Sequence, residues 1–300
     1  MASPWLHRYA VVLAVCTLFL VIAGASVTSN QAGLSVPDWP LSYGKVMPEM
    51  RGGVFFEHGH RMIASTVGFL TIILAIWLWR ADNRRWMKIL GIVSLLAVIV
   101  QGVLGGMTVL FMLPKPVSIS HACLAQLFFS TTVAIAIFTS RSWMEGPSYV
   151  EDTGWPSLRS LALTTAVLVL AQVALGAGYR HRAFTVMPHV IGSIVVTAMI
   201  LIVSIFVLAQ FGSHPVLRRC AMVLIGITCV QVVLGIVAYM ARLNTLDAPY
   251  PGTGTVLLTV LHVATGALTL AASIVLAIQV LRNVRPHLSQ AAQHLSPVSR

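Results

Sequence analysis

Five consecutive residues, Glu57-His58-Gly59-His60-Arg61, directly precede an 18-residue run without charge, 62–79. If they belong to the first turn of a helix, the three-residue step puts the carboxylate of Glu57 on the same face as the imidazole of His60. Ionisable groups at a bilayer edge cost free energy unless they are paired, solvated or metal-bound. This stretch is therefore read either as a reactive site, with an acid beside a metal-bound imidazole, or as an interfacial turn with solvated charges.

Four histidines recur at similar places near the start of every second apolar run: His60, His121, His189 and His262. Offsets of 129 and 141 pair His60 with His189 and His121 with His262. Two neutral imidazoles from facing helices are what a six-coordinate haem iron requires. Each could instead be a core histidine bonded to a hydroxyl or carbonyl group, but four at equivalent depths favour iron ligation.

Two further histidines, His58 and His181, have no partner in the repeat and are expected to support a site or to lie at the interface. Zinc fits poorly, because no cysteine or carboxylate recurs beside the paired histidines in both halves. The four cysteines all fall within apolar runs and indicate neither a disulfide framework nor a Cys-x-x-Cys site.

The two halves differ in the residues that flank the first histidine of each pair. Glu57 lies three residues before His60, whereas Val186 lies three before His189. Arg61 follows His60, whereas Val190 follows His189. This asymmetry predicts chemistry in the first half and an electron carrier in the second.

The elements that position these residues follow from composition. Of the 300 residues 57% are hydrophobic and only 9% are charged, which excludes a soluble domain of this length and indicates a polytopic membrane protein. A bilayer core needs about 20 apolar residues per helix. Eight charge-free runs meet or approach that length, and they predict eight spans: 9–37, 62–79, 89–114, 116–140, 160–179, 183–217, 220–241 and 248–281.

An internal repeat divides the spans four and four. Gln101-Gly102-Val103-Leu104-Gly105 recurs after 130 residues as Gln231-Val232-Val233-Leu234-Gly235, and Gln172-Val173-Ala174-Leu175-Gly176 carries the same pattern. We therefore expect an all-α integral membrane protein built as two pseudo-symmetric four-helix bundles, residues 1–145 and 146–300, with an ordinary solvated linker at 141–158. Close helix packing alone could also account for these glycines.

Orientation is predicted from the basic residues. With both termini in the cytoplasm, twelve of the 19 Lys and Arg lie inside, which fits a multi-pass protein of the inner (plasma) membrane. The formal charge of +11 does not indicate nucleic-acid binding, because the basic residues are scattered singly or in pairs. The first outer loop, 30–56, contains Pro37-Asp38-Trp39-Pro40 and Tyr43-Gly44, and is expected to form a rigid aromatic cap at the interface.

Several of these features together resemble the haem A synthase family. They are Glu57-x-x-His60-Arg61, the loop from Gly33 to Gly44, the Gln-x-x-Leu-Gly helices and the four histidines, and the match covers nearly the whole chain. Many family members carry cysteines at the positions of Val36 and Ser42, so the resemblance implies no disulfide or redox role for this loop here.

The resemblance implies oxidation of the C8 methyl group of haem O to the formyl group of haem A, for use in cytochrome oxidase. By matched position, His189 and His262 would ligate a haem b cofactor, His60, His121 and Arg61 would bind the substrate haem, and Glu57 would be catalytic. Haem O synthase, an electron donor and membrane lipid would be partners, and a homo-oligomer is compatible with the sequence.

A protein of another class fits the same histidines: a dihaem b-type electron carrier, in which both pairs hold permanent haems and Glu57 moves protons to or from a quinone. Haem A in the extracted pigments separates the two. A transporter with inverted repeats fits less well, because four spans per half give parallel repeats.

Overall fold

The computed structural model describes residues 4–244 and 251–286. Eight long helices follow one another along the chain, each long and apolar enough to cross a membrane. They are α1 (Pro4–Ser29), α2 (Gly53–Ala81), α3 (Arg85–Leu110), α4 (Lys115–Phe138), α6 (Leu158–Arg180), α7 (Met187–Gln210), α8 (Pro215–Leu243) and α9 (Thr253–Asn283). The prediction of an all-α membrane protein with eight spans is confirmed.

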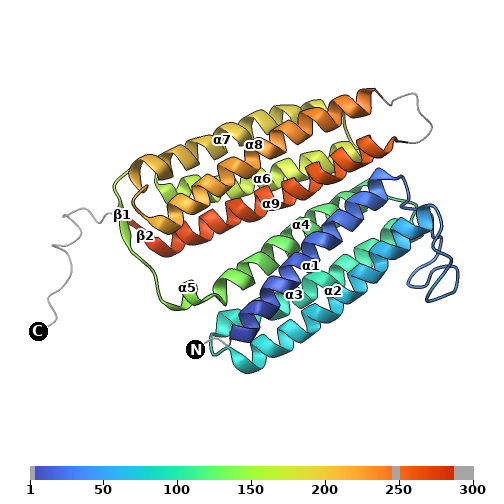
Figure 1. Ribbon diagram of the computed structural model, residues 1–300, viewed down its shortest axis with the longest axis horizontal. Coiled ribbons are helices and arrows are strands. Elements are labelled where there is room, and N and C mark those ends of the chain that lie inside the picture. The colour runs from blue at the N-terminus through green and yellow to red at the C-terminus, as the bar shows by residue number, and fades with distance from the viewer. Residues whose placement is uncertain (1–3, 245–250, 287–300) are drawn as a thin grey trace, which may run out of the picture.

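The long helices form two groups that lie side by side, α1–α4 and α6–α9 (Figure 1). The groups touch through α1 and α4 against α9, and through α4 against α6. Buried Val21, Phe129, Ala267 and Ala271 form the apolar cluster at this junction. Because α1 begins and α9 ends at the same end of the molecule, the loop between α1 and α2 lies at the opposite end, here called the loop end (Figure 1).

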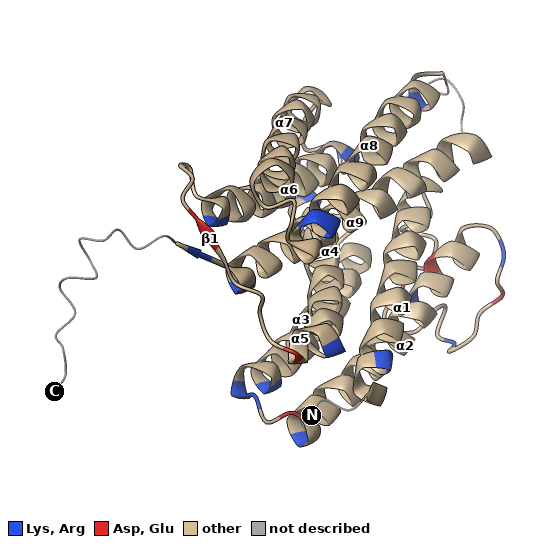
Figure 2. Ribbon diagram, turned by 60° about the vertical axis from the view of Figure 1, so that its left-hand side comes forward, with Lys and Arg blue, Asp and Glu red and all other residues tan. Residues whose placement is uncertain are grey.

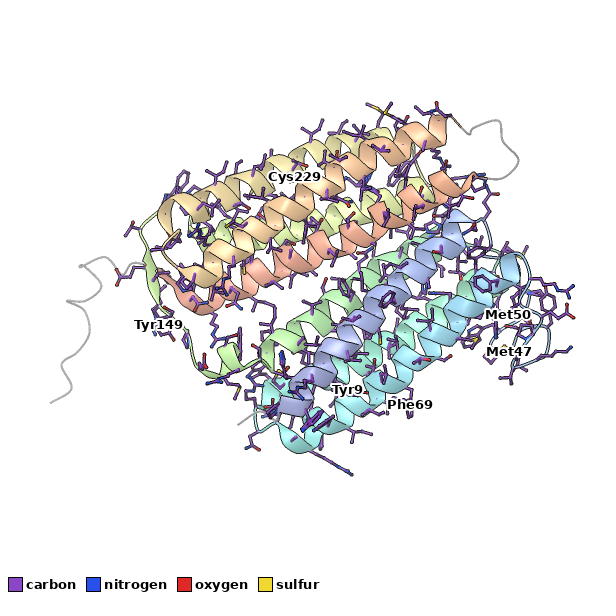
Figure 3. All side chains as sticks on the ribbon, viewed as in Figure 1. Tyr9, Met47, Met50, Phe69, Tyr149 and Cys229 are labelled. Carbon is purple, nitrogen blue, oxygen red and sulfur yellow. The ribbon has the colours of Figure 1, made fainter. Side chains whose placement is uncertain are left out.

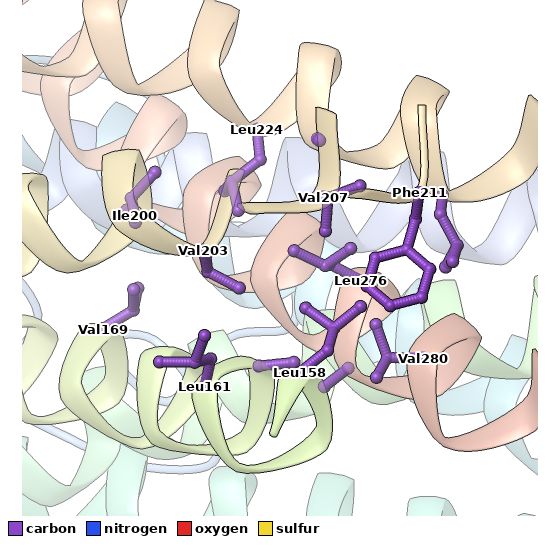
Figure 4. Close-up of a cluster of buried hydrophobic side chains, with 14 of the residues drawn as sticks. Leu158, Leu161, Val169, Ile200, Val203, Val207, Phe211, Leu224, Leu276 and Val280 are labelled. Carbon is purple, nitrogen blue, oxygen red and sulfur yellow. The ribbon is translucent and has the colours of Figure 1, made fainter. Parts of the chain in front are cut away.

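Each group encloses its own apolar core. In the second group, side chains from four helices interdigitate (Figure 4), among them Leu158, Leu161, Val169, Ile200, Val203, Val207, Leu224, Leu276 and Val280. In the first group the core contains Leu6, Leu13, Val67, Leu74, Leu78, Met87, Phe128 and Ile135. Apolar side chains also project outward along the bundles, such as Phe69 and Cys229 (Figure 3), as expected where lipid replaces water.

Charged residues lie at helix ends and in loops, away from the middles of the spans (Figure 2). Arg8 lies inside α1, four residues after its start, with its guanidinium 4.9 Å from the centre of the Trp5 ring. A long side chain of this kind can reach the interface while its helix continues into the membrane.

The charge-free runs misplace some boundaries. The run 9–37 was expected to be one span, but α1 ends at Ser29. The loop expected at 30–56 ends at residue 52, where α2 follows, and we call it the outer loop after its predicted side of the membrane. The run 183–217 contains the whole of α7 and the start of α8. A run without charge shows which residues a membrane can accept. It does not show where a helix begins or ends, because that depends on backbone hydrogen bonds and turns.

The connection between the two groups is more ordered than the solvated linker expected at 141–158. It contains a short helix, α5 (Arg141–Met144), and a strand, β1 (Val150–Asp152), which pairs in parallel with β2 (Val284–Pro286). Buried Asp152 accepts hydrogen bonds from the backbone of Gly154 and Leu158, and so organises the start of α6. The predicted boundary between residues 145 and 146 lies in this connection.

Candidate functional site

The four paired histidines all lie near the first turns of their helices, at the loop end of the molecule. His60 is in α2, His121 in α4, His189 in α7 and His262 in α9, and these four helices all begin at that end (Figure 1). Each ring is half-buried. The structure thus gives each helix group two histidines at one end of the bundle.

In the second group the two rings lie close together, edge to face. The centres of the His189 and His262 rings are 6.2 Å apart, and the ring planes are inclined by 85°. Two imidazoles bound to opposite sides of one metal, through bonds of about 2 Å, place their ring centres roughly 6 Å apart. This pair therefore fits a flat macrocycle that brings its own equatorial ligands to the metal.

In the first group His60 and His121 lie close enough to interact electrostatically. Among the described residues their rings do not make a ring contact of the kind that joins His189 to His262. His181, at the end of α6, lies within electrostatic reach of His121 and so sits at the junction of the two groups.

Every one of the four imidazoles rests against a glycine of the preceding helix. A Cβ atom added to Gly24 would lie 3.1 Å from Cε1 of His60, and one on Gly105 would lie 3.4 Å from Cε1 of His121. The corresponding distances are 2.9 Å for Gly176 against His189 and for Gly235 against His262. A side chain at Gly176 or Gly235 would displace the ring, one at Gly24 would press on it, and one at Gly105 would make ordinary contact with it. We call these four residues the seat glycines.

The inner nitrogen atoms of three rings have unused hydrogen-bonding capacity. Nδ1 of His60, His121 and His262 is buried and has no hydrogen bond of ordinary geometry within the described chain. A backbone carbonyl lies beside each ring, that of Leu20, Gln101 and Gln231 respectively. A small rotation would complete an Nδ1–H to carbonyl bond, which is the arrangement that leaves Nε2 free to bind a metal. Three observations therefore fit histidines that bind haem iron: the glycine beside each ring, the buried Nδ1 atoms, and the separation of the His189 and His262 rings.

Glu57 and Arg61 form a buried ion pair that holds the outer loop. Glu57 Oε1 accepts a hydrogen bond from Arg61 Nη2 at 2.7 Å, and its Oε2 accepts one from the backbone N–H of Val36 at 2.9 Å. Arg61 Nη1 donates to the carbonyl oxygens of Asp38 and Leu41, at 2.8 and 2.9 Å. Because α2 begins at Gly53, these residues lie beyond the first turn in which they were expected.

His58 points to the same loop. Its side chain is buried, and Nδ1 lies 2.8 Å from Oγ of Ser42. Three successive contacts from α2, through Glu57, His58 and Arg61, thus tie the loop to the helix that carries His60. The supporting role expected for His58 takes the form of this contact.

The loop is further held by its own hydrogen bonds. The Asp38 carboxylate accepts from the backbone N–H groups of Tyr43 and Gly44, and Tyr43 donates its hydroxyl to the carbonyl of Ser35. The hydrogen bond from Gly44 is the main reason that the pKa of Asp38 lies below its ordinary value. The ring of Trp39 packs on Gly106 of α3, next to the seat glycine of His121.

Sequence reasoning found the four histidines, Glu57 and Arg61, but it treated the glycines as packing residues. It also missed the contact of Gln172 with His189, where Gln172 Nε2 lies 3.0 Å from Nδ1. The recurring spacing of four residues from Gln to Gly was the available signal.

Part of this chain matches known proteins in sequence. A family model described as COX15-CtaA, cytochrome oxidase assembly protein, matches residues 49–186, a segment that includes Glu57, His60, Arg61 and His121 and ends shortly before His189.

Three relatives are each named haem A synthase. That of Halalkalibacterium halodurans is 29% identical over 178 residues, covering 56% of this chain and 57% of the relative. That of Alkalihalophilus pseudofirmus is 30% identical over 135 residues (44% and 46%), and that of Shouchella clausii is 32% identical over 133 (43% and 44%). The matches span about half the length of these relatives. The family model and the relatives together show that about half of this chain is similar to haem A synthases and to cytochrome oxidase assembly proteins.

Proposed function

We propose that this chain is a haem A synthase, which oxidises the C8 methyl group of haem O to a formyl group and so supplies haem A to cytochrome oxidase. The observation that carries the proposal is the pair of histidine sites, one of which has an acid and a guanidinium beside it. The relatives' names support the same reaction.

In the second helix group, His189 and His262 would hold a haem b cofactor through their Nε2 atoms. The ring separation of 6.2 Å supports this assignment. Haem b would supply one-electron transfer. The first turn of α7 contains no acid, which suits a group that stores an electron rather than one that moves protons.

In the first helix group, His60 and His121 would bind the substrate haem O, and Glu57 would be the catalytic residue. Methyl oxidation releases protons, and a fixed carboxylate can accept a proton or orient water. Glu57 is buried, is held in place by Arg61 and the Val36 N–H, and lies one helical turn before His60. Because the Glu57 carboxylate is already held in place, little rearrangement of the protein would be needed when charge develops during the reaction.

Arg61 would retain the substrate haem. A guanidinium can grip a carboxylate with two parallel hydrogen bonds. Both terminal nitrogens of Arg61 already donate hydrogen bonds. A haem propionate would therefore have to replace the carbonyl oxygen of Asp38 or Leu41 as an acceptor. Otherwise Arg61 would retain the haem indirectly, by holding the loop in place. The farnesyl tail would extend into lipid.

The chain would work in the plasma membrane with both termini in the cytoplasm, supplied by haem O synthase and reduced by an electron donor. The test is to express it in cells that make haem O but lack haem A synthase, and to extract the pigments. Haem A is expected. Pigments with protohaem and haem O alone, together with two protein-bound b-type haems, would overturn the proposal in favour of an electron carrier.

A further inference from the structure

The second helix group fixes its first histidine with a side-chain amide. Nε2 of Gln172 in α6 lies 3.0 Å from Nδ1 of His189 and donates to the backbone carbonyl of the same histidine at 2.8 Å. One amide therefore ties the imidazole to its own backbone, so the ring has little freedom to rotate.

Gln231 makes the equivalent connection for the second histidine. Its Oε1 accepts a hydrogen bond from the hydroxyl of Thr265, which lies one turn after His262 in α9. The same hydroxyl is 3.2 Å from the backbone carbonyl of His262. Gln231 is thus joined to the turn that carries the ligand.

Room for both amides comes from a second pair of glycines. A Cβ atom on Gly192 would lie 2.2 Å from Oε1 of Gln172, and one on Gly266 would lie 3.3 Å from Nε2 of Gln231. The offsets that relate the histidines, 129 and 141, map these glycines onto Ile63 and Ala125 in the first group. Only the second helix group therefore has a glycine that leaves space for a glutamine side chain beside each helix that carries a histidine.

The first helix group has neither connection. Leu20 lies four residues before the seat glycine Gly24, in the position that Gln172 holds before Gly176. Gln101 is present before Gly105, but within the described residues its amide makes no hydrogen bond to His121 or to the turn that follows it. Its Oε1 is buried without a partner, as Oε1 of Gln172 also is, so the two residues differ in the contacts of the amide nitrogen. No side-chain amide therefore fixes His60 or His121 within those residues.

We propose that Gln172 and Gln231 are positioning residues which make the second site retain its haem, and that Leu20 and the unengaged Gln101 leave the first site free to exchange haem. The inference rests on the proposed function, in which one haem is a resident cofactor and the other must enter and leave. Residues that orient a metal ligand commonly change metal affinity by about 10- to 100-fold.

The test uses Gln172→Leu, which installs the residue found at the equivalent position of the first group. In a His60→Ala background, which removes one ligand of the first site, the purified full chain is mixed with excess apomyoglobin and haem transfer is followed by absorption. We expect release to be about 10-fold faster than from the His60→Ala parent. Gln101→Leu is the matched control and should leave release from the second site unchanged.

Gln172→Met keeps the length of the side chain but has no amide, so it separates the lost hydrogen bond from lost packing. It should release haem as fast as Gln172→Leu, and it also serves if Gln172→Leu does not accumulate. Release that stays at the parent rate in either variant would overturn the inference. The readout concerns the b-type haem alone, so it remains informative if the extracted pigments contain no haem A and the proposed function fails.

The converse test is Leu20→Gln with Ile63→Gly, which builds the amide and its space into the first site. Haem bound there should then exchange more slowly than in the parent chain. Unchanged exchange in a correctly folded double variant would contradict the assignment of retention to the amides.

Discussion

The Glu57 carboxylate accepts a 2.7 Å hydrogen bond from the guanidinium of Arg61, one helical turn later in α2. Only 5% of the Glu57 side chain and 16% of the Arg61 side chain are exposed. The pair Arg141–Glu145 has the same spacing, but 95% and 62% of those side chains are exposed. The buried pair can therefore serve both to hold the loop and to fix a reactive carboxylate, and the exposed pair provides a control.

The first prediction concerns Glu57→Gln, which keeps the shape of the side chain and removes its charge. We expect the variant to fold, to keep haem b, and to accumulate haem O or its singly hydroxylated form instead of haem A. Glu57→Gln should lower the free energy of unfolding by about 1–3 kcal/mol more than Glu145→Gln does, because most of the partner Arg61 side chain is buried. Pigment extraction and thermal unfolding measure the two effects. A normal yield of haem A would leave Glu57 with the loop-holding role alone.

The second prediction separates the two histidine pairs. Replacement of His189 or His262 by Ala should remove or alter the visible absorption of a low-spin b-type haem, because one axial nitrogen is lost. His60→Ala and Glu57→Gln should preserve that spectrum. Absorption spectra and redox titration of the purified variants check this, and an unchanged spectrum and potential in His189→Ala would remove the second group from consideration as the cofactor site.

The third prediction concerns Arg61→Lys. A lysine ammonium is a single point of charge and cannot serve Glu57 and the loop carbonyl groups as the forked guanidinium does. We expect the variant to lose substrate haem while it keeps haem b, and its outer loop to be cleaved faster by added protease. Haem content per protein and the rate of proteolysis are the measurements. Equal loss of both haems would indicate misfolding instead.

The fourth prediction is a pH dependence of the outer loop. The pKa of Asp38 is lowered from its ordinary value of 3.8, chiefly by the hydrogen bond from the Gly44 backbone, so the ionised form stabilises the folded loop. That stabilisation is fully present above the ordinary value and is lost as the pH falls through the lower, folded-state pKa. Exchange of Tyr43 and Gly44 amide hydrogens, corrected for intrinsic rates, should stay slow down to about pH 4 and then accelerate.

Asp38→Asn is the matched variant for this prediction. An amide keeps an oxygen acceptor but has no charge, so the loop should exchange faster at neutral pH and show no acid transition of its own. A wild-type transition that is complete above the ordinary value, or the same transition in Asp38→Asn, would assign the effect to another group.

Local sequence determined much of this protein. Apolar runs of membrane length fix the number of spans, because a bilayer accepts only segments that satisfy their own backbone. The spacing of Glu57 and Arg61 in one helix fixes their contact, because helical periodicity is a local property. The repeat of Gln and His along the chain was sufficient to indicate which four imidazoles belong together.

Only the tertiary structure decided how these residues are used. The rotation of each helix about its axis, which no local pattern specifies, places a seat glycine under each imidazole and Gln172 beside His189. The path of the outer loop brings the Val36 N–H to Glu57 and Ser42 to His58, across 21 and 16 residues of sequence. These contacts depend on how closely backbones approach, and that distance is set by the packing of all eight helices together.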